Sequence, residues 1–392
     1  MPVHTVYVGA HDFHADLPRL FAKEAGDFFA AIFPDAEAIA ERLGLETELA
    51  RRVHRRVASR FSGDEDGDAD LGRVVKDLRV DFEDGYLIGA ETDANTREDE
   101  DAERCAAAAV SALKNQSLPP GFGLRIRSKA DSTRARSMAT LEKFVVGVVR
   151  ELGEWPEGFV VTLAKIDHAS EVTRLADALD GLESRCGLER GTVPVELMAE
   201  TPRSIIGADG RVVMADWLEA ARGRCVGVHF GVYDYTASLG LAAHLQGPRH
   251  ANCDLARGLL QVALAGTGVE LSDGSSRLVP RLSMPPNELQ ASIDEVAAAV
   301  EHALERAIYR GWDMAPSHVV IRWLATTAFF LRALPSMRQR LAAFAEARSE
   351  DLEDAATLTA VRGFFRRGLD SGVFDEEDLG DAGPKLADMI GL

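Results

Sequence analysis

Short apolar runs of strand length alternate with longer amphipathic segments through most of this chain. Eight runs fit β-strands, at residues 5–9, 78–82, 123–127, 158–164, 193–199, 225–230, 278–282 and 312–315. The segments between them have helical character, which is clearest at residues 287–309, where an apolar residue recurs every three or four positions. This alternation predicts a parallel sheet with helices outside it. Eight strands favour a closed (β/α)8 TIM barrel over an open doubly wound sheet.

Two helical regions do not belong to the regular alternation. Residues 15–75 predict a helical insertion after the first strand, and residues 346–392 predict an acidic, helical C-terminal extension. We therefore expect one barrel domain over residues 1–345, with the insertion included, followed by the extension. A chain of 392 residues can bury a core of this kind without disulfides.

The charge balance of the chain argues against two classes of partner. It has 44 Lys and Arg residues against 63 Asp and Glu residues, a formal net charge of −19, so its surface repels nucleic-acid phosphates and anionic membranes. The densest acidic runs, at residues 63–70 and 98–103, are interpreted as solvated loops. The chain has neither a G-x-G-x-x-G after the first strand nor a P-loop, which weakens nucleotide-binding interpretations.

Cysteine usage and hydropathy bear on the compartment. The four cysteines lie far apart and form no C-x-x-C pair, which indicates free thiols in a reduced compartment and argues against a zinc site. The first residues lack the basic start and apolar run of a signal peptide. No stretch of about 18 apolar residues predicts a membrane span, so we expect a cytoplasmic protein.

Function in a barrel gathers at the C-terminal ends of the strands, and five predicted strands carry ionisable side chains there. These are Glu83 and Asp84 after the second strand, Arg125 and Arg127 on the third, Lys165 after the fourth, Glu200 after the fifth and Asp234 after the sixth. Arg125 and Arg127 lie two residues apart and are therefore expected to share one face of their strand.

Glu200 and Asp234 follow successive strands and can meet at one point. Carboxylate ligands with open positions beside them suit Mg²⁺ or Mn²⁺, and such a metal can hold a 2-oxo acid and stabilise its enolate. Arg125 is suited to neutralise a substrate carboxylate or a developing negative charge. Each residue also has a structural explanation, because Glu200 could cap the helix opened by Pro202, and either arginine could belong to a salt bridge.

Five sequence blocks fall in order at the predicted strand ends between residues 78 and 240. They are V-D-F-E-D-G at 80–85, L-R-I-R at 124–127, L-A-K-I at 163–166, V-E-L-M-A-E-T-P at 195–202, and G-V-H-F-G-V-Y-D-Y at 227–235 with L-G at 239–240. In this order they resemble the citrate lyase β-subunit/malyl-CoA lyase and 2-oxo acid aldolase family of the pyruvate/phosphoenolpyruvate barrel superfamily. G-W-D-M-A-P-S-H at 311–318 is similar to a late block of that family.

The resemblance implies a divalent metal, usually Mg²⁺, held by Glu200 and Asp234. It also implies that Arg125 binds a substrate carboxylate or oxyanion, and that Glu83 and Asp84 act as catalytic groups that orient Arg125 or a water on the metal. The predicted substrate-binding side chains are Arg125, Arg127 and Lys165. The chain departs from the family at Arg127, where the family has asparagine, and at Ala164, where it has proline. No adenine-binding signature for coenzyme A is recognisable.

The predicted activity is therefore that of a metal-dependent carbon–carbon lyase or aldolase, which acts through the enolate of a small 2-oxo acid of the pyruvate or oxaloacetate type. One alternative is an acyl-CoA lyase or synthase of the malyl-CoA or citryl-CoA type, which would use the same metal and arginine. A second alternative is a non-catalytic barrel subunit. The resemblance also implies a homo-oligomer.

The group that transfers the proton stays open among a water on the metal, Asp84, a histidine and a residue of another subunit. His229 lies within a strand and is interpreted as a hydrogen-bonded core residue. Further candidates near predicted strand ends are His11, His14, Asp313 and His318.

Overall fold

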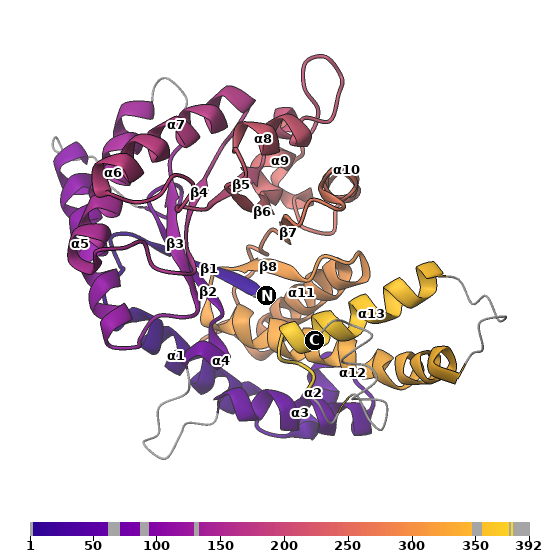
Figure 1. The fold of residues 1–392 in the computed structure, drawn as a ribbon. Coiled ribbons are helices and arrows are strands. Elements are labelled where there is room, and N and C mark those ends of the chain that lie inside the picture. Colours follow the sequence, from indigo (N-terminus) through magenta and orange to yellow (C-terminus); the bar gives the residue numbers. More distant parts are fainter. Residues whose placement is uncertain are drawn as a thin grey trace.

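A closed barrel of eight parallel strands, hydrogen-bonded in chain order, forms the centre of the protein (Figure 1). The computed structural model describes residues 3–61, 71–86, 94–128, 133–346, 355–375 and 378. The strands are β1 (His4–Gly9), β2 (Asp77–Asp81), β3 (Gly121–Ile126), β4 (Phe159–Leu163), β5 (Val195–Ala199), β6 (Cys225–Phe230), β7 (Glu270–Asp273) and β8 (Arg310–Asp313). β8 closes the barrel on β1, with His4 beside Gly311 and Val6 beside Asp313. The predicted TIM barrel is confirmed.

Seven of the eight predicted strands overlap an observed one, and the seventh is wrong. Residues 278–282 form a loop, in which Leu278 and Leu282 are exposed and Pro280 lacks the amide hydrogen that a ladder needs. The true seventh strand, β7, has the sequence Glu-Leu-Ser-Asp and carries no apolar run. Its polar residues are tolerated inside because Asp273 accepts hydrogen bonds from the buried Arg257 guanidinium.

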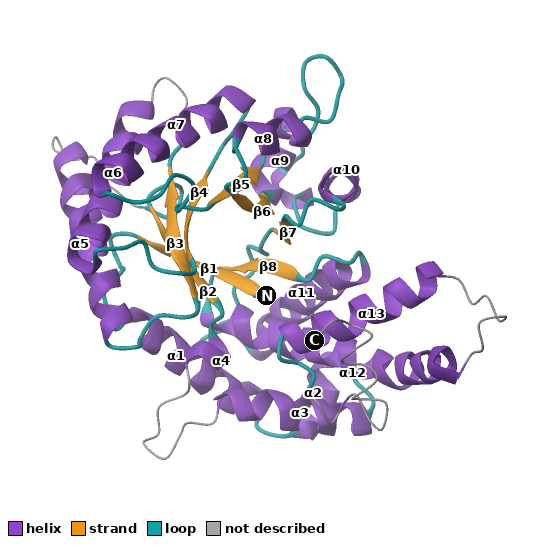
Figure 2. Cartoon of the chain, in the orientation of Figure 1, coloured by secondary structure: helices purple, strands orange, loops and turns teal. Residues whose placement is uncertain are grey.

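Helices surround the barrel on its outer side (Figure 2). They are α5 (Ala94–Lys114), α6 (Arg134–Leu152), α7 (Ala169–Cys186), α8 (Met214–Ala220), α9 (Val232–Ser238), α10 (Ala251–Leu264), α11 (Pro286–Glu305) and α12 (Pro316–Glu346). Their apolar faces and the outward side chains of the strands make up most of the core. In α11, Ile293, Val296, Val300 and Leu304 are buried, as the periodicity predicts.

The predicted insertion and extension pack together on one side of the barrel (Figure 1). The insertion consists of α1 (Leu17–Ile32), α2 (Ala36–Leu43), α3 (Thr47–Phe61) and α4 (Leu71–Val74), and the extension contributes α13 (Ala355–Asp370). Val57 of α3, Trp323 of α12 and Phe365 of α13 belong to one buried apolar cluster. Helical extensions on a barrel are thereby confirmed, while the division of the chain at residue 345 stays a prediction.

The structure bears on two sequence expectations, the acidic runs as loops and the absence of a membrane-spanning segment. The acidic run at residues 98–103 lies in helix α5 and not in a loop, and the Glu98 side chain is buried, where it accepts a hydrogen bond from Thr140 at 2.6 Å. The run at residues 63–70 lies outside the described residues. One helix, over Pro316–Ala343, is long and apolar enough to cross a membrane, but 67% of its most apolar window is buried against the rest of the protein. That burial is typical of a packed core helix.

Inside the barrel, toward the N-terminal ends of the strands, ion pairs replace an apolar core. Glu196 of β5 accepts hydrogen bonds from Arg79 at 2.9 and 3.0 Å and from Arg310 at 2.8 Å, and Arg310 also bonds to Asp77. Although burial acts to raise it, the two guanidinium groups hold the pKa of Glu196 well below its usual range. His229 lies 3.0 Å from Glu196, so it is a core residue, as predicted.

Candidate active site

Arg125 is the last-but-one residue of β3 and points into the barrel at its C-terminal end. Its side chain is 2% exposed, and both Nε and Nη2 donate to the carboxylate of Asp81 on the neighbouring strand β2. The guanidinium carbon lies 4.9 Å from the centroid of the Tyr7 ring and 5.0 Å from that of Trp312. Among the described residues, the only acceptor that Nη1 reaches is a weak one, the Met198 sulfur, at 3.5 Å. That nitrogen is available to a ligand in a fixed direction.

Asp81 also shapes the turn that follows β2. It accepts hydrogen bonds from the backbone amides of Glu83 at 2.9 Å and Gly85 at 2.8 Å. A Cβ atom on Gly85 would lie 2.4 Å from the Asp81 carboxylate, so the turn requires glycine there. Asp81 is not among the predicted site residues; Glu83 and Asp84 were expected to orient Arg125 or a water on the metal, and Glu83 lies 4.0 Å from Arg125. No local signal distinguishes Asp81, because Asp77 and Arg79 of the same strand are also charged.

Lys165 connects the acidic groups of the site. Its Nζ atom donates to Asp84 at 2.8 Å and lies 3.3 Å from Glu83 and 3.8 Å from Asp234, while its backbone amide donates to Glu200 at 2.5 Å. The residue has a φ of 49°, in the left-handed region that non-glycine residues rarely adopt. This conformation turns the amide toward one carboxylate and the ammonium toward three others, and backbone strain of this kind is common at functional sites.

Glu200 follows β5 and is buried against the end of β6. A Cβ atom on Gly231 would lie 2.3 Å from Glu200 Cβ and 2.8 Å from its Oε2, so glycine is needed for this approach. Burial, with a smaller contribution from Asp234 and Glu83, raises the pKa of Glu200 to about 7, although Arg125 opposes the shift. Burial also raises the pKa of Glu83 to about 7. Both shifts indicate carboxylates that lack sufficient positive charge around them.

A cavity of about 490 Å³ opens at this end of the barrel and brings the predicted residues together. Its lining includes Asp84, Arg125, Glu200 and Asp234, and Lys165 and Glu83 contact this group. Arg127 is not part of it: β3 ends at Ile126, and the Arg127 side chain points to Glu98 of α5 at 3.3 Å. The expectation that Arg125 and Arg127 share a face is therefore wrong, because the strand ends one residue too early.

The arrangement of the carboxylates suits an open site for an ion such as Mg²⁺ better than a site in which protein side chains fill every ligand position. Three carboxylates, those of Glu83, Asp84 and Asp234, lie around the ammonium of Lys165, and a fourth, that of Glu200, accepts a hydrogen bond from its backbone amide. Glu200 and Asp234 line the cavity from neighbouring strand ends. In the described part of the chain, no three His, Cys, Asp or Glu side chains converge as ligands. Mg²⁺ commonly uses one or two carboxylates and fills its other positions with water and substrate. The donor set therefore suits Mg²⁺ or Mn²⁺.

The remaining candidates have structural contacts. Asp313 forms a buried ion pair with Arg322 at 2.9 Å, and the Nε2 atom of His318 lies 2.7 Å from the carbonyl oxygen of Leu278. His11 lies beside Gly9, which lines the cavity, and 3.3 Å from an Asp12 oxygen. His14 is exposed.

Several wall residues were not predicted. Tyr7 and Trp312 form an aromatic wall, with ring centroids 4.4 Å apart, and Tyr233 and Arg277 stand at the opening. Tyr233 could have been noticed as the neighbour of Asp234. No sequence signal pointed to Arg277, because it directly precedes residues 278–282, which were wrongly predicted to be the seventh strand.

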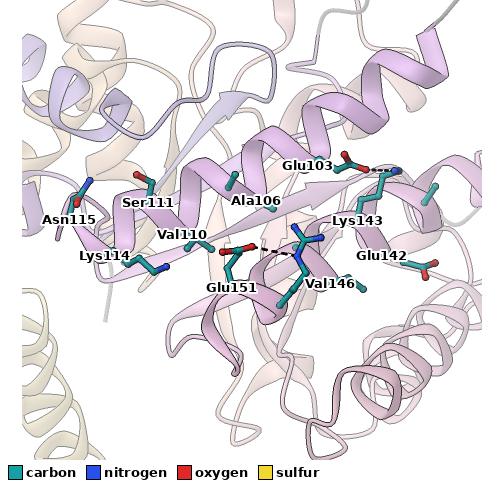
Figure 3. A pocket seen from close by; sticks show the side chains of 14 residues that line it. Glu103, Ala106, Val110, Ser111, Lys114, Asn115, Glu142, Lys143, Val146 and Glu151 are labelled. Carbon is teal, nitrogen blue, oxygen red and sulfur yellow. Dashed lines mark hydrogen bonds and ion pairs between the residues drawn. The ribbon is translucent and has the colours of Figure 1, made fainter.

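A larger hollow, of about 780 Å³, lies on the outer side between α5 and α6 (Figure 3). Its floor contains small and apolar residues such as Ala106 and Val110, and its rim is charged. Lys143 pairs there with Glu103. The hollow includes none of the predicted site residues, so the smaller cavity in the barrel is the better candidate for chemistry.

The closed parallel barrel defines the fold class, a (β/α)8 TIM barrel, and its mouth is acidic. Within this class the chain belongs to the family described as a domain of unknown function, DUF6986, whose model matches residues 1–391. No curated protein matches the sequence.

Solved structures share the fold at low sequence identity. The protein CitE from Mycobacterium tuberculosis, in complex with magnesium, acetoacetate and coenzyme A, is 18% identical, with a TM-score of 0.50 over 95% of this chain and 98% of that one. Haloferax volcanii malate synthase, in a magnesium/glyoxylate complex, is 12% identical, with a TM-score of 0.50 over 100% of this chain and 97% of that one. The predicted superfamily resemblance is confirmed at the level of the fold.

Proposed function

We propose that this chain is a Mg²⁺-dependent carbon–carbon lyase that acts through the enolate of a small 2-oxo acid of the pyruvate or oxaloacetate type. The observation that carries the proposal is one cavity in which a fixed guanidinium, Arg125, shares the wall with two carboxylates from neighbouring strand ends, Glu200 and Asp234. Solved structures with the same fold contain magnesium together with a small oxo acid, acetoacetate or glyoxylate, which supports a magnesium site that takes a small oxo acid. Mn²⁺ suits the same ligands.

In this proposal Glu200 and Asp234 hold the metal, which when bound supplies Lewis-acid polarisation of a keto oxygen. Arg125 donates from Nη1 to the substrate carboxylate or to the oxygen that becomes negative in the enolate. Asp81 keeps the guanidinium in one orientation, so no reorganisation is needed when charge develops. The aromatic wall of Tyr7 and Trp312 excludes water from one side of Arg125.

Glu83 and Asp84 are the proposed acid–base groups beside this centre. Lys165 donates a hydrogen bond to Asp84 and favours its ionised form, whereas the burial of Glu83 favours a carboxyl that keeps its proton near neutral pH. Lys165 positions Glu83 and Asp84. We propose that it acts on the substrate indirectly, through these two carboxyl groups. Arg127 has no place in this scheme, because it pairs with Glu98.

Calorimetric titration of metal-stripped protein with pyruvate and with oxaloacetate, in the presence and absence of Mg²⁺, tests the proposal. We expect binding only with Mg²⁺, and loss of that binding in Glu200→Gln. The matched control is Glu142→Gln, since Glu142 is a half-exposed glutamate of α6 that pairs with Arg185 outside the barrel. Pyruvate should also take up solvent deuterium at its methyl group. Metal-independent binding, or equal binding by both variants, would overturn the proposal.

The same experiment separates the alternatives. Saturable binding of acetyl-CoA with metal-dependent glyoxylate binding would indicate an acyl-CoA lyase or synthase of the malyl-CoA or citryl-CoA type. Binding of no 2-oxo acid and no acyl-CoA would indicate a non-catalytic barrel. A homo-oligomer stays a prediction that light scattering tests directly. A cytoplasmic location stays a prediction that cell fractionation tests.

A further inference from the structure

The loop that follows β7 brings a second guanidinium to the mouth of the cavity. Arg277 lines the same cavity as Arg125 and Glu200, and its side chain is exposed. Its guanidinium carbon lies 3.9 Å from the centroid of the Tyr233 ring. Because Tyr233 directly precedes Asp234 at the start of α9, this cation stands next to a proposed metal ligand.

Contacts on three sides fix the position of Arg277. Its backbone amide donates to the Tyr233 hydroxyl at 2.8 Å, and its Nη1 atom donates to the Gln246 side-chain oxygen at 3.3 Å. The next carbonyl along the chain, that of Leu278, lies 2.7 Å from His318 Nε2. A side chain that is stacked and held in this way loses little conformational freedom when a ligand binds.

The charge of Arg277 differs from that of the other cations of the site. Arg125 is neutralised by Asp81, and Lys165 is surrounded by carboxylates. The contacts of Arg277 within the described residues are to an aromatic ring, a hydroxyl and an amide oxygen, none of which carries a negative charge. A planar guanidinium with free donors is a binding group for a carboxylate or a phosphate.

The size of the cavity leaves room for a ligand that reaches from Arg125 to this rim. If each non-hydrogen atom takes roughly the 30 Å³ of a liquid water, pyruvate fills only about 180 Å³. The cavity measures about 490 Å³.

We propose that Arg277 binds a second anionic group of the substrate, a carboxylate or a phosphate, at the end remote from the 2-oxo acid. The proposal rests on the function proposed above and narrows it to 2-oxo acids, or aldol products of them, with two anionic ends. Arg125 and the metal take one end, and the Arg277–Tyr233 stack takes the other.

The test compares two probes of equal carbon number, 2-oxoglutarate and 2-oxovalerate, which differ only in the distal carboxylate. On the Mg²⁺-loaded full chain, calorimetry should show 2-oxoglutarate binding about tenfold more tightly, the effect of one charge-assisted hydrogen-bonded pair. Arg277→Gln should remove this preference and leave 2-oxovalerate binding unchanged. Arg277→Lys should keep part of it, because the charge remains but the planar fork is lost.

The matched control is Arg249→Gln, which removes a half-exposed arginine that already pairs with Glu295 and should leave the preference intact. Comparison of 3-phosphonopyruvate with oxaloacetate then tells a phosphate-type from a carboxylate-type distal group, and Arg277→Gln should weaken whichever binds more tightly. Equal binding of the two five-carbon probes by the wild-type protein, or equal loss of both in Arg277→Gln, would overturn this inference alone. Failure of every 2-oxo acid to bind with Mg²⁺ would overturn the proposed function and the inference with it.

Discussion

Substitution of Asp81 by asparagine tests whether a buried charge pair holds the Arg125 guanidinium in place. Each of the two side chains is 2% exposed. The Asp81 carboxylate receives two hydrogen bonds from Arg125 and one each from the amides of Glu83 and Gly85. Asparagine keeps one acceptor oxygen, turns an NH₂ group toward other donors and leaves the arginine charge uncompensated.

The expected cost follows from these contacts. Removal of one partner of a buried ion pair typically destabilises a protein by about 3–5 kcal/mol, and since asparagine keeps part of the hydrogen bonding we expect about 3 kcal/mol for Asp81→Asn. Replacement of both charges removes the penalty of the isolated cation. The double variant with Arg125→Met should therefore recover at least about 1 kcal/mol, because Met198, Tyr7 and Trp312 offer the new methionine apolar contacts.

Urea unfolding at neutral pH, followed by circular dichroism, measures these differences. The matched control is Asp209→Asn, in which an exposed aspartate loses its pairing with Arg211 and the midpoint should not change. Binding of pyruvate to Mg²⁺-loaded Asp81→Asn should be lost as well, because Arg125 is no longer directed at the cavity. The reasoning is refuted if Asp81→Asn is as stable as Asp209→Asn, or if the double variant is as unstable as the sum of the single ones.

Three further predictions follow from individual contacts. Burial raises the pKa of Glu200 to about 7, so Mg²⁺ affinity should rise with pH up to about 7 and then level off, and a flat calorimetric profile below pH 7 would contradict this. Burial lowers the pKa of His4 from 6.5 to about 4; the unfolded chain therefore takes up the proton first as the pH falls, and about 3 kcal/mol of stability should be lost between these values. The urea midpoint of His4→Gln should fall less than that of the wild type as the pH decreases from 6.5 to 4. An equal fall in both proteins would assign the lost stability to other groups. Gly231→Ala should weaken Mg²⁺ binding about tenfold or more, because the added Cβ displaces Glu200. Gly247→Ala is the control, since a Cβ added there meets nothing within 4 Å. Equal Mg²⁺ affinities of the two variants would contradict the steric argument.

The sequence predicts the parts of this fold that depend on neighbouring residues. Strand β6 matches its predicted range because Val228 and Phe230 give an apolar run that ends at a glycine, Gly231. Strand β7 was missed because its stability comes from ladders with β6 and β8 and from the contact of Asp273 with Arg257, 16 residues earlier. Local hydropathy contains no trace of such a contact.

The same limit applies to the site. The residues that follow strands, such as Glu200 and Asp234, could be predicted to lie near one another because all strand ends of a parallel barrel meet at one face. The pairing of each cation with its anion could not be predicted. Arg125 is 44 residues from Asp81, and Arg127, just beyond the end of β3, pairs with Glu98 of α5.

Under the proposed function, we expect the charge at the cavity mouth to set the order in which the metal and the acid bind. Three carboxylates lie around the ammonium of Lys165 there, and a fourth, that of Glu200, accepts from the Lys165 backbone amide. Arg125 is already neutralised by its buried partner, Asp81. A 2-oxo acid that approached this mouth alone would meet a net negative charge in a partly buried site, where repulsion is poorly screened. A divalent cation would offset most of that charge, so under the proposed function we expect the metal to bind first and the acid second. Arg277 lies outside the paired set and attracts an anion in either state, so it can guide the substrate without replacing the metal. Tight binding of pyruvate to metal-free protein would therefore contradict the charge argument as a whole and not the role of one residue.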